Sequence, residues 1–179
     1  MSDLKELKVF DTNFQDWEIE KVNELPENLQ KLTISCRLEL LENTPESLKH
    51  LKIIGNELKE LKHLPTNLEI LNLLCTNSIK VLSDLPINLQ ELIFCNTKIT
   101  SFTIPSRLTK LHCINSNLEI LPELPETLRE LDCSHNKLIS LPKIPENLEF
   151  LICFENNIKI LSNLPKNTKL NCDKFVEIL

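Results

Sequence analysis

Residues 121–138 read LPELPETLRELDCSHNKL, and this stretch contains one complete turn of the pattern that organises the whole chain. A proline is followed by apolar residues three, six and eight positions later, then by a side-chain amide at position eleven and a leucine at position thirteen. In this stretch these residues are Pro125, Leu128, Leu131, Cys133, Asn136 and Leu138. We number positions in every turn from its proline.

The same proline recurs along most of the chain. Successive members are separated by 19, 20, 21, 19, 20, 20 and 20 residues. They are Pro26, Pro45, Pro65, Pro86, Pro105, Pro125, Pro145 and Pro165. A period near 20 residues with leucine at fixed offsets is typical of a leucine-rich repeat, in which each unit buries its apolar residues only against its neighbours.

The spacing of residues within one unit predicts its local structure. Leu131-Asp132-Cys133 alternates as a strand does, with the first and third residues inward. A polar residue at position eleven can bond backbone amides where the chain leaves the sheet. It is Asn56, Thr97, Ser116, Asn136 or Asn156 in five of the units. The second half of each unit contains prolines, which delete amide donors and favour extended backbone.

These features predict a right-handed leucine-rich repeat solenoid with a parallel β-sheet on its concave face, an extended, polyproline-like convex side and little helix. About nine coils at a strand spacing of roughly 4.8 Å give a length on the order of 40 Å. A single glycine, Gly55, serves the whole chain. Since left-handed turns ordinarily use glycine, we expect the ten prolines to turn the chain instead.

The quoted stretch resembles the short leucine-rich repeats of bacterial effectors, typified by the YopM and IpaH families. The resemblance covers about residues 25 to 165. It implies a protein-binding module directed at a host cell. The frequent use of Asn, Ile and Lys favours a bacterium or a large virus with AT-rich coding as the source. The families usually carry a helical hairpin before their first repeat, and no such segment is recognisable here.

We expect one domain spanning residues 1–179. Residues 1–24 form a degenerate first coil, residues 25–164 form seven repeats, and residues 165–179 close the solenoid. The first coil lacks a proline but keeps the spacing of apolar residues, with Glu18 to Glu24 as a small insertion. Its pattern consists of Leu4, Leu7, Val9, Thr12, Phe14 and Trp17.

Composition restricts the partners. A net charge of -6 disfavours nucleic acid, because phosphate binding needs a concentrated basic surface. No apolar run approaches the roughly 20 residues of a membrane span, and the charged N-terminus does not resemble a signal peptide. Seven cysteines spaced by the repeat favour thiols in a reducing compartment. We therefore expect a protein or peptide partner, a cytoplasmic location in the producer or in a host cell, and a monomer or weak self-association.

The expected partner surface consists of the residues that alternate with the buried ones, at positions five, seven and nine. Position nine is notably apolar, and aligned apolar side chains on an open face favour a covering partner over incidental β-forming residues. Phe150, Ile152 and Phe154 lie on one strand, with Glu130 and Asp132 on the strand before it, like an aromatic anchor ringed by carboxylates. The predicted partner-binding residues are Phe10, Lys52, Ile54, Asn72, Leu74, Ile93, His112, Ile114, Asp132, Phe150, Ile152 and Phe154.

Charge along this face should change from basic to acidic. The basic end carries Lys8, Lys31, His50, Lys52 and Lys110. These charges serve either recognition or solubility, and composition does not separate the two.

The cysteines invite a metal or catalytic interpretation, but their spacing favours a simpler one. Cys113, Cys133, Cys153 and Cys172 occupy the inward position of successive units, where Leu73 and Phe94 stand elsewhere, so we expect small buried hydrophobes without metal. Cys36, Cys75 and Cys95 fall at or beyond strand ends. His112 lies one coil from Cys95, a pairing that lacks an orienting group and oxyanion donors.

No catalytic machinery or cofactor site is expected, so the function indicated is non-catalytic protein binding on the concave face. The alternative implied by the resemblance is the substrate-recognition part of a ubiquitin ligase, because one of the families joins such repeats to a cysteine-dependent catalytic domain. That domain is absent from these 179 residues.

Overall fold

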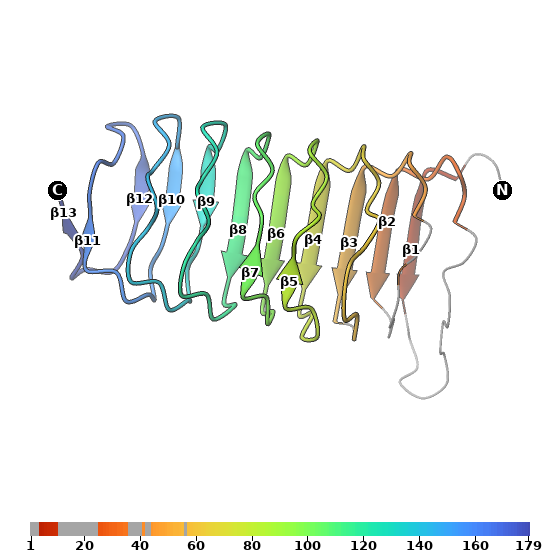
Figure 1. The fold of residues 1–179 in the computed structure, drawn as a ribbon, viewed down its shortest axis with the longest axis horizontal. Helices are drawn as coiled ribbons and strands as arrows, with labels where there is room; N and C mark the ends of the chain where they lie inside the picture. Colours follow the sequence, from red (N-terminus) through yellow and green to blue (C-terminus); the bar gives the residue numbers. More distant parts are fainter. Residues whose placement is uncertain (1–3, 11–24, 36–40, 42–43, 56) are drawn as a thin grey trace.

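The computed structural model describes residues 4–10, 25–35, 41, 44–55 and 57–179. The described chain folds into the predicted solenoid, and these residues include no helix, so none is available to cross a membrane. One layer is a nine-stranded parallel sheet whose strands stack in chain order (Figure 1). Thr12, Phe14, Trp17, Asn56, Cys36 and the insertion at residues 18–24 lie outside the described residues.

The strands of the large sheet are five residues long in the first part of the molecule and three in the last. They are β1 (Glu6–Phe10), β2 (Lys31–Ser35), β3 (His50–Ile54), β4 (Ile70–Leu74), β6 (Glu91–Cys95), β8 (Lys110–Ile114), β9 (Glu130–Asp132), β10 (Phe150–Ile152) and β12 (Lys169–Asn171). The register places inward residues side by side, for example Leu131 next to Leu111 and Leu151. Neighbouring coils therefore bury one another's leucines, and the core runs the length of the molecule.

The return segments form the second layer, which is extended and only locally paired. It contains β5 (Val81–Leu82) beside β7 (Ser101–Phe102), and β11 (Ile160–Leu161) beside β13 (Glu177–Ile178). Phe102 packs edge-on against Phe94 of the large sheet, with ring centroids 5.1 Å apart. The contact joins the two layers.

Each of the eight regularly spaced prolines begins a turn that leads into a strand. The proline carbonyl accepts a hydrogen bond from the backbone N–H three residues later, at 2.9 to 3.1 Å in all eight coils. A proline carbonyl is still available for this bond although the ring nitrogen has no proton to donate. The prolines mark the repeat because they form this turn.

The expectation that prolines replace left-handed turns was wrong. After each strand of the large sheet from β3 to β10, position ten adopts a left-handed backbone, with φ between 48° and 56°. Only one of these residues is glycine, and they are Gly55, Cys75, Asn96, Asn115, His135 and Glu155. The N–H of each residue bonds an oxygen of the next coil, which holds the conformation in place. Each of these coils thus contains two turns, one at the proline and one at position ten. The left-handed turn at position ten forms even where the residue is not glycine.

Side-chain hydrogen bonds reinforce the coil exits as predicted for position eleven. The Asn136 amide donates to the carbonyls of Cys113 and Cys133 at 2.6 and 3.0 Å, and its oxygen accepts from the N–H groups of Ser116 and Leu118. Asn156 repeats the arrangement one coil later. The asparagine therefore ties its own coil to the preceding one.

Candidate functional site

The candidate site is the outer surface of the nine-stranded sheet, which we call the strand face and define by positions five, seven and nine. Strands β3, β4, β6 and β8 each alternate between half-buried outward and fully buried inward residues, as predicted. The register aligns the outward residues in rows across the strands, as in Lys52, Asn72, Ile93 and His112. The rigid backbone of paired strands fixes the spacing of these side chains.

The structure places the predicted residues on this face with differing exposure. Several of these side chains are only half-exposed. They are Ile54, Leu74, Ile114 and Phe154 at position nine and Asn72, Ile93 and Ile152 at position seven. Among the side chains of this face that the structure describes, Phe150 is the most exposed large apolar one, at 39%. Phe10 lies at the end of β1 opposite Ser35. Ser134, which the alternation put outside, is instead 2% exposed, because its hydroxyl and N–H both bond to the Asp132 carboxylate at 2.6 and 3.0 Å.

The aromatic pair on and beside β10 contacts residues that the sequence did not single out. The Lys169 ammonium lies 4.8 Å from the centre of the Phe150 ring, a distance at which a cation is attracted to the ring face. The Phe154 ring packs edge-on against His135, with centroids 5.0 Å apart. Both partners could have been found from the spacing, because Lys169 is next to Phe150 in the predicted register and His135 occupies the turn position one coil earlier.

The carboxylates predicted to ring the aromatic residues are engaged elsewhere. Glu130 Oε1 lies 2.6 Å from His112 Nε2 and 3.1 Å from Lys110 Nζ, both on β8. Burial alone would raise the pKa of Glu130, but the hydrogen bonds and charges of Lys110 and His112 outweigh it and lower the pKa. Asp132 binds Ser134, so the two carboxylates that stand beside Phe150 and Ile152 in the register are both engaged by other side chains.

The polar group of Lys110, His112, Glu130 and Asp132 divides the strand face into two apolar areas. One lies on β4 and β6 and includes Ile70, Leu74 and Ile93. The other consists of Phe150, Ile152 and Phe154. The register places β8 and β9 between them.

Cysteine chemistry on this face is not that of an activated nucleophile. Burial, with smaller effects of Cys75 and Asp132, raises the pKa of the Cys95 thiol, whereas a reactive cysteine needs a lowered pKa. His112, the histidine one coil from Cys95, lies at hydrogen-bond distance from Glu130. The inward Cys113, Cys133 and Cys153 are buried as predicted, and burial raises the pKa of Cys153 to about 12.

The six described cysteines are all free thiols. Within the described ranges, no three His, Cys, Asp or Glu side chains come together to hold a metal ion.

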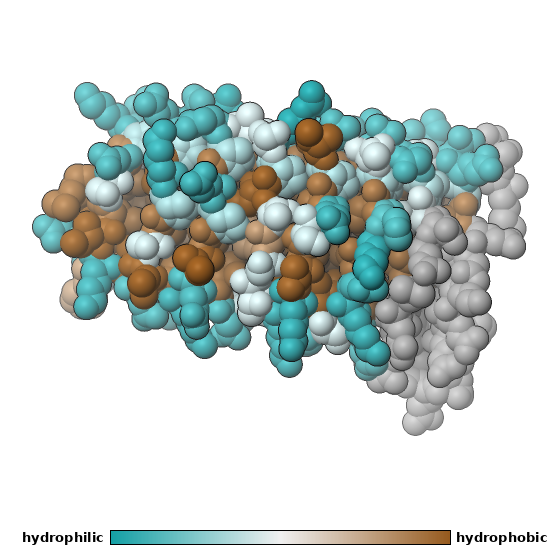
Figure 2. Space-filling model, in the orientation of Figure 1, coloured by the Kyte–Doolittle hydropathy of each residue, from teal (hydrophilic) through white to brown (hydrophobic). Residues whose placement is uncertain are grey.

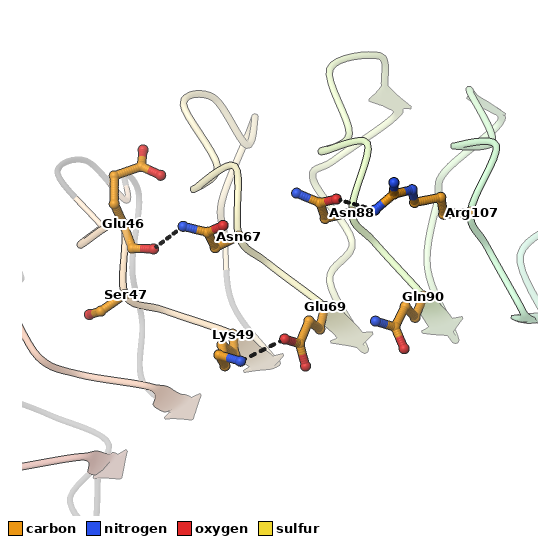
Figure 3. A pocket seen from close by; sticks show the side chains of 8 residues that line it. All are labelled: Glu46, Ser47, Lys49, Asn67, Glu69, Asn88, Gln90 and Arg107. Carbon is orange, nitrogen blue, oxygen red and sulfur yellow. Dashed lines mark hydrogen bonds and ion pairs between the residues drawn. The ribbon is translucent and has the colours of Figure 1, made fainter.

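A polar hollow of about 390 Å³ lies at the edge where the strands begin (Figure 3). Its side chains bond one another across coils: Asn67 to the Glu46 carbonyl at 3.2 Å, Lys49 to Glu69 at 2.8 Å and Arg107 to Asn88 at 2.9 Å. The bonds of Asn67 and of Arg107 with Asn88 form a second row of hydrogen bonds between coils at position two, which we did not predict from the sequence. The recurrence of Asn, Ser or Thr two residues after the proline would have revealed it.

The return layer carries apolar residues that are more exposed than those of the strand face. Ile120 and Ile139 are 77% and 72% exposed, and Phe175 is 95% exposed near the C-terminus. Figure 2 shows hydrophobic residues scattered along the middle of the molecule and gathered at the end that carries the C-terminus. These residues make the return layer the competing surface for a partner.

Comparison with known proteins identifies similar structures. No family model matches the chain, and no curated protein matches it in sequence. Among solved structures, the chain is similar to YopM from Yersinia enterocolitica WA-314, with a TM-score of 0.60 and 25% identity over 87% of this chain and 47% of that one.

A second similar structure is described as YopM, a leucine-rich effector protein from Yersinia pestis. It gives a TM-score of 0.54 and 26% identity over 81% of this chain and 54% of that one. The chain thus spans about half the length of the YopM structures that it matches. The likeness supports an effector-like leucine-rich repeat fold and, with it, a protein-interaction module.

Proposed function

We propose that this chain is a non-catalytic recognition module that holds a protein or peptide against its strand face. The observation that carries the proposal is the row of half-buried apolar side chains at position nine, together with the 39% exposed Phe150 farther along the same face. The row consists of Ile54, Leu74, Cys95 and Ile114, which lie in register on adjacent strands. Aromatic residues at the centre of a packed contact contribute disproportionately to binding. A repeat surface of this kind acts by occupying or scaffolding its partner.

The wider setting of the proposal is that of a host-directed effector acting in a cytoplasm. It is supported by the similar Yersinia structure that is described as an effector protein. Nothing in the described coils favours the alternative of a ubiquitin-ligase recognition domain.

The proposal is tested by comparing the two faces. We would immobilise the wild-type chain, a strand-face variant (Phe150→Glu with Phe154→Glu) and a return-layer variant (Ile120→Glu with Ile139→Glu), and identify captured proteins from host-cell lysate by mass spectrometry. Both variants add two negative charges. The strand-face variant should lose the partner while retaining the wild-type circular dichroism spectrum, and the return-layer variant should keep it.

The reverse result would move the binding site to the return layer. A partner retained by both variants would place the contact on neither set of residues. Either outcome contradicts the strand-face proposal.

A further inference from the structure

The strand face carries a cationic area directly beside its first apolar area. Lys31 on β2 is paired in register with His50 on β3, and Thr33 is paired with Lys52. On the other side of β3, His50 adjoins Ile70 and Lys52 adjoins Asn72 of β4. Two strands with basic outward groups are therefore followed by β4, whose outward groups include Ile70 and Leu74, and by β6, whose outward groups are Ile93, Cys95 and Glu91, the last of these beside Ile70.

Lys31 and Lys52 are engaged less closely by carboxylates than two other lysines of the face, Lys8 and Lys110. Lys8 lies 3.0 Å from Glu6, and Lys110 lies 3.1 Å from Glu130. Glu6 is the register neighbour of Lys31, and its pKa is lowered mainly by Lys8 and to a smaller extent by the charge of Lys31. Among the residues that the structure describes, no carboxylate lies close enough to Lys31 or Lys52 to form an ion pair. In a chain whose net charge is -6, two adjacent unpaired lysines make a local surface opposite in sign to the whole protein.

The apolar area next to them has a polar group at its centre. Asn72 lies between Ile70 and Leu74 along β4 and beside Ile93 of β6. Its Oδ1 atom is buried and has no hydrogen-bond partner. A buried amide oxygen without a partner costs about 1–3 kcal/mol. Turning the Asn72 amide outward to a donor on a ligand, such as a backbone N–H, would recover that cost.

We propose, as a refinement that rests on the proposed function, that the strand face between β2 and β6 binds an extended acidic–apolar peptide segment of the partner. The acidic end lies over Lys31 and Lys52, and the apolar end over Ile70, Leu74 and Ile93. Three strand spacings separate β2 from β6, about 14 Å. An extended peptide covers that distance with roughly four to five residues. The ligand is therefore a short linear segment in which acidic residues adjoin apolar ones.

The test uses a displayed library of random ten-residue peptides selected against the full chain. Enriched peptides should place Asp or Glu beside Leu, Ile, Val or Phe. Binding of a fluorescein-labelled selected peptide, measured by anisotropy, should weaken at least about tenfold, or 1.4 kcal/mol, in the Lys31→Glu, Lys52→Glu variant. The matched control, Lys137→Glu with Lys159→Glu, changes the net charge equally at exposed lysines away from the strand face and should leave affinity unchanged.

Three results would overturn the inference: selected peptides without acidic residues, equal binding by the Lys31/Lys52 and control variants, or equal competition by poly-glutamate, which lacks apolar side chains. Failure of this inference is distinguishable from failure of the proposed function. Peptides that depend on Phe150 and Phe154 but not on Lys31 and Lys52 would leave the strand face as the binding surface and remove only the acidic–apolar ligand.

Discussion

The middle coils, built on β4 and β6, and the later coils, built on β9 and β10, bury residues at the same positions but are stabilised differently. In the middle coils position eight is large, as in Phe94, and position eleven is a threonine. In the later coils position eight is a cysteine and position eleven an asparagine. The middle strands run for five residues and the later ones for three.

Hydrogen bonding follows the same division. Asn136 bonds backbone groups of two coils, whereas the buried Thr76 hydroxyl has no partner and Thr97 bonds only the Ser116 hydroxyl and, at 3.4 Å, the N–H of Ile99. The two regions are therefore stabilised in different ways. The middle coils have larger buried apolar side chains and longer paired strands, whereas the later coils have more side-chain hydrogen bonds. Five measurements test whether the two regions also differ in how these residues contribute to the free energy of unfolding.

The largest effect is expected for a buried charge in either region. Leu71→Asp and Leu131→Asp each replace a fully buried leucine, and an unpaired charge there should cost at least about 4 kcal/mol. Since each coil is covered only by its neighbours, several coils should unfold together. Urea denaturation followed by circular dichroism measures this, with Leu131→Met as the conservative control. A small effect at one site alone would show that its coils do not belong to the cooperative unit.

The second effect separates volume from hydrogen bonding. Phe94→Ala removes a fully buried ring that also packs on Phe102, so the free energy of unfolding should fall by about 3–5 kcal/mol. Cys133→Ala removes only a sulfur atom and should cost about 1 kcal/mol. Equal losses in the two variants would contradict the view that the middle coils depend more strongly on the large residue at position eight.

In the third comparison the later coils, and not the middle coils, should show the larger loss of stability. Asn136→Ala leaves two buried N–H groups and two carbonyls without their side-chain partner, and we expect a loss of about 2–4 kcal/mol. Thr76→Val removes a hydroxyl that has no partner, so stability should change by less than about 0.5 kcal/mol or rise. Thermal and urea unfolding of both variants provide the measurement. A destabilised Thr76→Val variant would show that the hydroxyl is bonded after all.

The fourth effect concerns the left-handed turn shared by both regions. Glu155 has φ of 55°, a conformation that costs a non-glycine residue about 1–2 kcal/mol, so Glu155→Gly should stabilise the chain by up to about 1 kcal/mol after the greater entropy loss of glycine. Lys137, which is exposed and not left-handed, supplies the control. Lys137→Gly should instead destabilise by about 0.5–1 kcal/mol, and the same sign for both variants would contradict the strain argument.

The proline spacing and the positions of leucine and cysteine were sufficient to predict the solenoid, its inward rows and the role of Asn136, because these depend on a strict repeat. The left-handed residues were missed, because Cys75 and Glu155 hold that backbone only through bonds to the next coil. On the strand face, the repeat spacing shows which side chains are neighbours, such as Lys169 and Phe150, but not which of several neighbours a side chain bonds. Glu130 could turn toward Phe150 or toward His112, depending on the competing side chains of neighbouring strands. The repeat pattern does not predict which of these contacts is stronger.

The smallest effect tests the junction between the two regions, where Glu130 of β9 bonds Lys110 and His112 of β8. Its pKa is lowered in the folded chain, so its contribution is fully present above the ordinary value of about 4.3. That contribution is lost as pH falls through the lower folded value. Glu130→Gln should therefore flatten the decline in stability below about pH 4.3, measured as urea midpoints at successive pH values. The exposed Glu123→Gln variant should retain the wild-type slope. An unchanged slope for Glu130→Gln would mean that burial offsets the two cations and that the junction, like the middle coils, is held by packing.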